Sequence, residues 1–274
     1  KPPKKKDITH IVEKTVVIDE LETEEKIIVN EDNTVDTVRV IVDSLLKVVE
    51  KIQFPKDNKN VLNNFFKDLI KAKSSGKVIR VLHYGDSQIE ADRITYYIRN
   101  KLQKCFGLSG PGMIPVVPAH NISISIRQSY SDNWKRYTIF GKVDTTVHHK
   151  KYGTLGAFCR YAPLREPIDT AKHDSIKNPL PDVIYESSIQ LKKSKATFST
   201  NRKFTQLKLY YGYNQHPVVA ELYNGDELLG LKSLHSNEKL SIAEWTVPVN
   251  AEEFTLKFSG KDSPDIYGIA MDGQ

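Results

Sequence analysis

The sequence predicts two fold classes in one chain: part of a three-layer α/β domain with a parallel sheet, and after it an all-β sandwich or jelly-roll domain. Helical periodicity, one buried-looking apolar run and a second helical period follow one another within residues 34–120. Short β-prone runs separated by turn sequences then fill residues 121–274. The first pattern is typical of α/β domains and the second of antiparallel sandwiches. With 274 residues and 39% hydrophobic content, the chain can form a substantial core.

Residues 1–33 are predicted to form an extended tether or an added edge strand, because charged residues alternate with short β-branched runs and no helical period is present. The net charge is +6, but Lys and Arg are interspersed with Asp and Glu, which argues against a nucleic-acid partner. No apolar run approaches the roughly 20 residues that span a bilayer, and the first residues lack the apolar core of a signal peptide. We therefore expect a mature or trimmed soluble product.

The predicted α/β part, residues 34–120, begins with two helices. Apolar residues recur every three or four positions from Val38 to Ile52, which predicts a helix from Thr34 that ends before a proline. A second helix is predicted from about Asn60 and ends at the polar turn KSSGK. The run VIRVLHY, residues 78–84, is predicted to be a strand buried on both faces. A third helix follows it, with an apolar face made of Ile94, Tyr97, Ile98, Leu102 and Cys105.

Residues 121–274 are predicted to contain about ten strands joined by hairpins and loops. Asn224-Gly225-Asp226 is one of the turn sequences that favour a hairpin there.

Cys105 and Cys159 are the only cysteines. Their spacing matches no zinc motif, so no metal site is predicted. A single disulfide would be possible in an oxidising compartment, but the pattern favours two buried thiols.

The turn Gly85-Asp86-Ser87 lies between the predicted strand and the third helix, where open α/β sheets bind ligands and unpaired backbone N–H groups can face developing negative charge. A serine hydroxyl in this place is a candidate nucleophile, similar in logic to a nucleophile elbow. The alternative is that Ser or Asp merely caps the helix, since both residue types are favoured there.

The wider stretch VLHYGDSQIEADRITYYIRNKLQKCFGLSGPGMIPVVP resembles the first block of SGNH (GDSL-like) hydrolases, in particular an envelope-associated branch with a β-rich insertion. The resemblance is close over about forty residues. It implies an esterase that works through a Ser-His pair, often on acetyl groups of carbohydrates, without metal or organic cofactor. It implies that Ser87 is the nucleophile and an oxyanion donor, and that Asp86 orients the turn. The same resemblance assigns substrate-binding roles to Gln88, Asp92 and the 107–112 loop with Gly110.

The general base of such an enzyme is not identifiable in the sequence. The family carries it in a D-x-x-H motif near the C-terminus, and no D-x-x-H follows Ser87. His83 is expected to be a core histidine of the strand, and the other histidines lie in the tether or in turn-like sequence. Three explanations remain open: a catalytic half absent from this chain, a second polypeptide that completes the fold, or degeneration of the enzyme into a binding scaffold.

The β-rich part is predicted to bind glycans, as sandwich domains often do through aromatic rings that stack on sugars. Trp134, in the polar setting SYSDNWKRY, is the first candidate for such stacking. The alternative is that its ring packs in the core, as most strand aromatics do.

Two functions follow from these observations. The first is an SGNH-like serine esterase or deacetylase that acts on esterified cell-envelope glycans and lacks its C-terminal half here. The alternative is a noncatalytic envelope scaffold that binds peptidoglycan, another glycan or a protein partner. The resemblance places either protein in the periplasm, the cell envelope or outside the cell, with a possible membrane anchor upstream of Lys1.

Overall fold

The computed structural model describes residues 23–29, 35–41, 58, 60–120, 123–164, 183–236 and 239–273. The chain divides into two compact units, residues 1–62 and residues 63–274.

The first unit contains an antiparallel pair of strands, β1 (Thr23–Val29) and β2 (Val35–Ile41), in which Thr23 lies opposite Ile41. The predicted helix from Thr34 is therefore wrong over Val35–Ile41. This stretch, VDTVRVI, is rich in β-branched residues, whose restricted side chains suit a strand better than a helix. The remainder of that helix prediction, and most of the predicted tether, lie outside the described residues.

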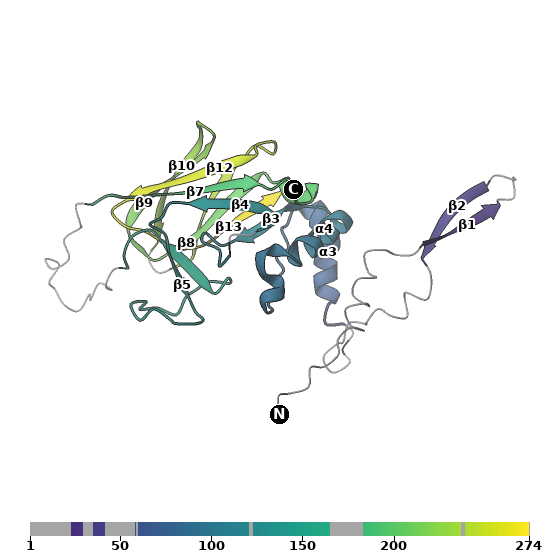
Figure 1. The fold of residues 1–274 in the computed structure, drawn as a ribbon, viewed down its shortest axis with the longest axis horizontal. Coiled ribbons are helices and arrows are strands. Elements are labelled where there is room, and N and C mark those ends of the chain that lie inside the picture. The colour runs from purple at the N-terminus through teal and green to yellow at the C-terminus, as the bar shows by residue number, and fades with distance from the viewer. Residues whose placement is uncertain are drawn as a thin grey trace, which may run out of the picture. The chain divides into compact units, whose positions relative to one another are not determined.

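The second unit begins with helices (Figure 1). Two are the helices predicted on either side of the GDS turn, namely α3 (Asn63–Ser75) and α4 (Thr95–Phe106). A 3-10 helix, η2 (Ser87–Asp92), precedes α4, and the four-residue helix α5 (Ser199–Arg202) lies much later in the chain. Helix α4 packs on the α5 region through the buried Asn100, whose Oδ1 accepts a hydrogen bond from the Thr200 hydroxyl at 3.0 Å.

Two antiparallel sheets make up the rest of this unit (Figure 1). The five-stranded sheet has the order β10-β9-β12-β7-β4, and the six-stranded sheet has the order β11-β8-β13-β6-β5 with β3 also paired to β13. The strand bounds are β3 Ser109–Ile114, β4 Ile126–Tyr130, β5 Lys135–Thr138, β6 Ala157–Arg160, β7 Tyr185–Lys193, β8 Gln206–Gly212, β9 Asn214–Asn224, β10 Glu227–Ser236, β11 Ser241–Thr246, β12 Glu253–Gly260 and β13 Asp265–Gly273.

The two sheets share one hydrophobic core because their strands alternate inward and outward side chains. In β12, for example, Phe254, Leu256 and Phe258 are buried while the residues between them are not. Leu209 of β8 and Ile269 of β13 meet them from the opposite sheet, and both are fully buried. The sequence-predicted hairpin at Gly225 is confirmed: Asn224 pairs with Glu227 across the turn, and Gly225 has a φ of 60°.

The predicted α/β class is wrong. The described chain is mostly β, its ladders are all antiparallel, and it shows no parallel three-layer sheet. Residues 78–84, predicted to be a parallel strand, have no regular secondary structure and pair with no strand of the described chain. An apolar run predicts burial but does not supply a neighbouring strand, and a strand needs one. The β-rich region also starts earlier than Asn121, because β3 falls within the stretch predicted as a loop.

Candidate functional site

The GDS turn follows the segment Val78–Gly85, which contacts the β strands and loops through the side chains of Arg80 and Tyr84. The Arg80 guanidinium makes a bidentate ion pair with the carboxylate of Asp272 on β13, at 2.6 and 3.2 Å. The Tyr84 hydroxyl donates to the carbonyl of Thr154 at 3.4 Å. Burial of Arg80 works against its charge, but the carboxylate of Asp272 outweighs this and raises the pKa of Arg80.

The hydrogen bonds of the turn show which residue caps the helix that follows it. Asp86 is the N-cap of η2, and its Oδ1 accepts a hydrogen bond from the backbone N–H of Gln88 at 2.9 Å. Ser87 is the first residue of η2 and is exposed. Neither its hydroxyl nor its N–H bonds to any described part of the chain. The capping role therefore belongs to Asp86, and the hydroxyl of Ser87 is left available.

Two consecutive residues after the turn adopt left-handed backbone conformations. Ala91 has a φ of 59° and Asp92 a φ of 65°, and they are the last two residues of η2, shortly before α4 begins at Thr95. Such conformations are strained in residues with a Cβ and cluster at functional sites. Gly85, in contrast, does not have a positive φ; a side chain there would meet Ile89, whose Cγ2 lies 3.3 Å from the position of a Cβ.

Asp92 is occupied by bonds within the protein. Its carboxylate accepts hydrogen bonds from Arg99 at 2.8 and 3.3 Å, and from the hydroxyls of Thr95 and Ser125. Ser125 directly precedes β4, and Ile124 donates its N–H to the carbonyl of Ala91 at 3.3 Å. Asp92 therefore anchors the turn to the β-sandwich, so its carboxylate is not free for the substrate-binding role predicted for it.

The remaining predicted site residues do not gather around Ser87. Gln88 adjoins Ser87 and is exposed. Gly110 is buried in β3 with a φ of 100°, and its carbonyl accepts a hydrogen bond from Gln103 at 2.8 Å. A Cβ there would lie 2.4 Å from the carbonyl oxygen of Met271, so this glycine is required by the close approach of β13.

Trp134 was expected to be exposed, and this expectation is wrong. Its side chain is 8% exposed, and its rings make edge contacts with Tyr161 and Phe258. Its indole N–H donates to the carbonyl of Ser188 at 3.1 Å. A ring whose edge and faces are covered by the core offers no surface for a sugar to stack on.

No described histidine hydrogen-bonds to Ser87. His83 was expected in the core but is exposed, while His120 Nε2 lies 3.7 Å from the carboxylate of Glu90. The one D-x-x-H in the sequence, Asp7 to His10, precedes the turn and lies outside the described residues.

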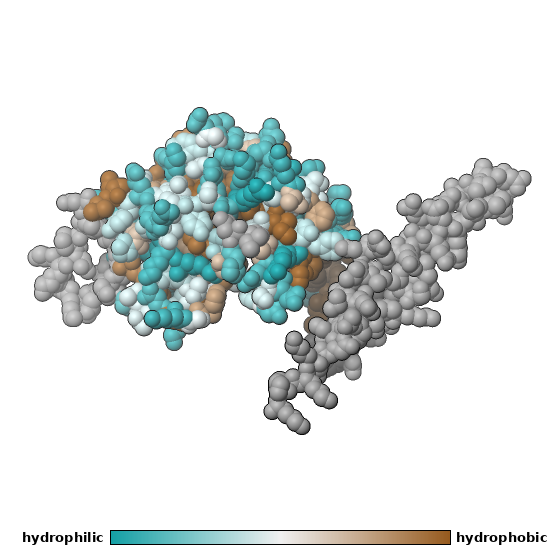
Figure 2. Space-filling view, in the orientation of Figure 1, coloured by the Kyte–Doolittle hydropathy of each residue, from teal (hydrophilic) through white to brown (hydrophobic). Residues whose placement is uncertain are grey.

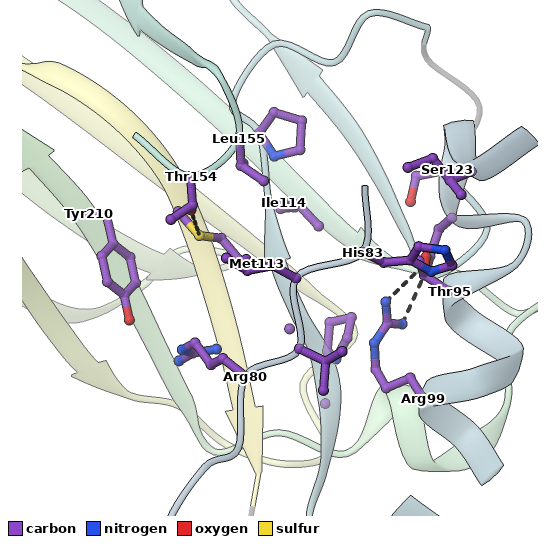
Figure 3. Close-up of a pocket in the computed structure, with 18 of the residues that line it drawn as sticks. Arg80, His83, Thr95, Arg99, Met113, Ile114, Ser123, Thr154, Leu155 and Tyr210 are labelled. Carbon is purple, nitrogen blue, oxygen red and sulfur yellow. Dashed lines mark hydrogen bonds and ion pairs between the residues drawn. The ribbon is translucent and has the colours of Figure 1, made fainter. Parts of the chain in front are cut away.

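A large apolar cavity adjoins the turn (Figure 3). Its volume is about 1190 Å³, and its lining comes from residues 78–85, the apolar faces of α3 and α4, and parts of β3 and of the 151–157 loop. In Figure 3 the side chain of Arg80 points toward Tyr210, while His83 extends toward the side of α4. Gly85, Glu90, Ala91 and Asp92 line the cavity, whereas Asp86, Ser87 and Gln88 do not. The candidate nucleophile is therefore at the rim.

The sequence did not predict a buried ionic network that links β6 to the start of β13. Arg160 is 3% exposed and bridges Asp265 at 2.7 Å and Asp262 at 2.9 Å. His149 Nε2 lies 2.7 Å from the other oxygen of Asp265. The spacing of the two aspartates in DSPD was the only signal, and it is too common to predict a network. These pairs join β6, β13 and the loop before β13, so we assign them a structural role.

No helix among the described residues is both long and apolar enough to cross a membrane. Within the described ranges, no cluster of three or more His, Cys, Asp or Glu residues could hold a metal ion. Comparison with known proteins found no matching family model and no matching curated protein.

The free thiols are placed differently from the expectation. Cys105 is exposed and Cys159 is buried, and they form no disulfide. The prediction of two buried thiols is thus wrong for Cys105.

Proposed function

We propose that this protein is a serine ester hydrolase in which Ser87 is the nucleophile. The observation that carries the proposal is that Asp86, and not Ser87, caps η2. The exposed hydroxyl and N–H of Ser87 therefore have no partner among the described residues. A hydroxyl used as a cap would be engaged with the backbone. The strained pair Ala91–Asp92 and the anchoring of Asp92 add support, because they hold the turn in a defined position against the sandwich.

The chemistry would proceed in two steps. The Ser87 oxygen attacks an ester carbonyl while a base removes its proton, and the alcohol leaves with a proton returned by that base. Water then attacks the acyl-enzyme, which releases the acid and restores the hydroxyl. The free N–H of Ser87 would donate to the oxyanion. Because no described histidine contacts Ser87, we assign the base to a group outside the described residues.

We propose esterified glycans of the cell envelope as the substrate class, with the protein in the periplasm or another envelope compartment. This part of the proposal is supported by the sequence resemblance of the GDS block alone. It does not draw on Trp134, whose burial removes it as a glycan-stacking platform. No metal or organic cofactor takes part in the proposed reaction.

Covalent labelling of the full-length protein with a fluorophosphonate tests the nucleophile. We expect labelling at Ser87, its loss in Ser87→Ala, and its retention in Ser74→Ala, a matched change of an exposed serine at the end of α3. Hydrolysis of 4-nitrophenyl acetate should fall in parallel with labelling. A folded wild-type protein that takes up no label, or a Ser87→Ala variant with unchanged labelling and hydrolysis, would reject the proposal.

A noncatalytic binding protein is the second candidate. The observation that favours it is the combination of a serine without a described base and a large apolar cavity next to it. Absence of labelling together with sedimentation of the protein with purified peptidoglycan, unaffected by Ser87→Ala, would support this candidate over the enzyme.

A further inference from the structure

The segment Val78–Gly85, which has no regular secondary structure, has backbone N–H and carbonyl groups without a backbone partner among the described residues. No backbone N–H or carbonyl of these residues bonds to another backbone group in the part of the chain that the structure describes. Each non-proline residue offers one donor and one acceptor, and an extended chain presents them in two rows. The segment is therefore a ready template for an added strand.

The same segment carries large apolar side chains that are exposed, and further exposed apolar side chains lie beside it. Val81 and Leu82 are each 55% exposed and Tyr84 is 73% exposed, although an apolar run of this kind is usually buried. The cavity beside them is also lined by exposed apolar residues from other elements, namely Ile98, Ile139, Phe140 and Leu240. In Figure 2, hydrophobic surface shows over the region where Figure 1 places α3 and α4. Exposed apolar surface that converges on one concavity marks an interaction site.

The dimensions and polarity of the cavity favour a polypeptide. Its volume of about 1190 Å³ exceeds the roughly 300–1,000 Å³ that is usual for small-molecule sites. A lipid could cover the apolar side chains but would leave the backbone donors and acceptors of Val78–Gly85 unpaired. Only an extended polypeptide backbone satisfies both requirements.

The charge of Arg136 favours a partner polypeptide that carries an acidic side chain over a second copy of this chain. Arg136 lines the cavity and makes no ion pair with any described residue, and its Nε is buried without a hydrogen-bond partner. A second copy of this segment would bring Arg80 and His83 but no acidic side chain, since the run reads VIRVLHY. Self-pairing therefore lacks the complementary charge.

We propose that this face binds an extended, largely apolar segment of a different polypeptide, which pairs with Val78–Gly85 as an added β-strand and brings a carboxylate to Arg136. The proposal does not depend on Ser87 being a nucleophile. Backbone pairing would supply affinity, and the apolar cavity beside the segment would select apolar side chains of the partner.

Selection of peptides from a random phage-displayed dodecapeptide library against the full chain, followed by hydrogen exchange, tests this interface. We expect enriched peptides to alternate apolar residues and to contain Asp or Glu. A synthetic peptide of the enriched sequence should slow exchange of the amides in Val78–Gly85 at least about tenfold, because ladder hydrogen bonds protect them.

Variants of the segment provide the controls. Adjacent residues of a strand direct their N–H groups to opposite edges, so at least one of Val81→Pro and Leu82→Pro should weaken peptide binding about tenfold or more. Leu82→Ser should also weaken binding, whereas Ile242→Ser should not, because Ile242 is similarly exposed (52%) but does not line the cavity. Circular dichroism confirms that each variant is folded.

Three results would overturn the proposal. The first is that enriched peptides leave the amides of Val78–Gly85 unprotected. The second is that both proline variants bind such peptides as well as the wild type does. The third is that these amides become protected only as the protein concentration rises, with dimer formation in analytical ultracentrifugation, which would make a second copy the occupant.

Discussion

At the scale of single residues, the left-handed pair Ala91–Asp92 has a cost and a compensation. Left-handed backbone costs a residue with a Cβ about 1–2 kcal/mol. The hydrogen bonds from Arg99, Thr95 and Ser125 to the carboxylate of Asp92 offset this cost. The result is a kink within the last residues of η2 that does not require a glycine.

The two cysteines differ enough in environment to be distinguished chemically. Burial raises the pKa of Cys159 to about 11, whereas Cys105 is exposed on α4. Since the thiolate is the reactive form, iodoacetamide at neutral pH should alkylate Cys105 and leave Cys159 unmodified until urea unfolds the chain. Mass spectrometry of tryptic peptides gives the two rates, with Cys105→Ala as the control. Equal alkylation of both thiols in the folded protein would contradict the structure.

The sequence predicted the position of the GDS turn better than it predicted which of its residues is the cap. The tripeptide at Gly85 marks a turn before a helix, but either Asp86 or Ser87 could have been its cap. Only the backbone geometry decides that Asp86 is. Trp134 shows the same limit: its polar neighbours in the sequence indicated exposure, while the core that covers it comes from strands far along the chain.

At the scale of elements, the pairing of β13 with β3 requires a glycine at position 110 of β3. Both Gly110 and Gly141 have positive φ, at 100° and 72°, so alanine is strained at either position. A Cβ at Gly110 would also lie 2.4 Å from the carbonyl of Met271, whereas nothing lies within 4 Å of one at Gly141. Gly141→Ala should cost about 1–2 kcal/mol of unfolding free energy. Gly110→Ala should cost clearly more, because β3 and β13 must separate.

Urea denaturation followed by tryptophan fluorescence measures both variants. Trp134 and Trp245 are buried in the sandwich core and report on its loss. If the two substitutions cost the same, the close approach of β3 to β13 is not present in solution.

Element type was predictable where the local pattern and the surroundings agree. Helices α3 and α4 were predicted because their amphipathic pattern matches their true environment, with one face toward the sandwich or the cavity. The prediction failed at Val35–Ile41, where apolar spacing fits a helix but the β-branched residues pair with β1. It also failed at residues 78–84, because a periodic pattern carries no information on whether a partner strand exists.

At the scale of the whole molecule, buried acids of high pKa make stability sensitive to alkaline pH. Cys159 has a pKa of about 11 in the folded chain, and burial also raises the pKa of Tyr161 and Tyr267. The folded state holds these protons more tightly than the unfolded state does. Their contribution is therefore complete below about pH 8.5, the pKa of an exposed thiol, and is lost as pH rises through about 11.

We expect the unfolding free energy to fall above about pH 9, with a slope of up to about 1.4 kcal/mol per pH unit for the thiol alone. Urea titrations at a series of pH values measure the slope. Cys159→Ala should flatten it between about pH 8.5 and 10, where the tyrosines contribute little, and Cys105→Ala should not. Stability that stays constant to about pH 11 would show that Cys159 is accessible to water.

The predicted fold class was wrong, but the antiparallel strands of the β-rich part do have a local signal in the sequence. Alternating burial and turn sequences define antiparallel strands locally, so the sandwich was foreseeable from residues such as those around Gly225. The order of strands within each sheet was not, because neighbours such as β3 and β13 lie at opposite ends of the second unit and no local pattern joins them.

The central position of β13 has a consequence for synthesis of the protein. All nine of its residues are buried, and it pairs with β3, β6 and β8, each of which leaves the ribosome earlier. The backbone groups with which those three strands pair to β13 therefore stay unpaired until Asp265–Gly273 emerges. Nascent chains stalled before Asp265 should consequently be the form of this protein most dependent on chaperones and most prone to aggregate.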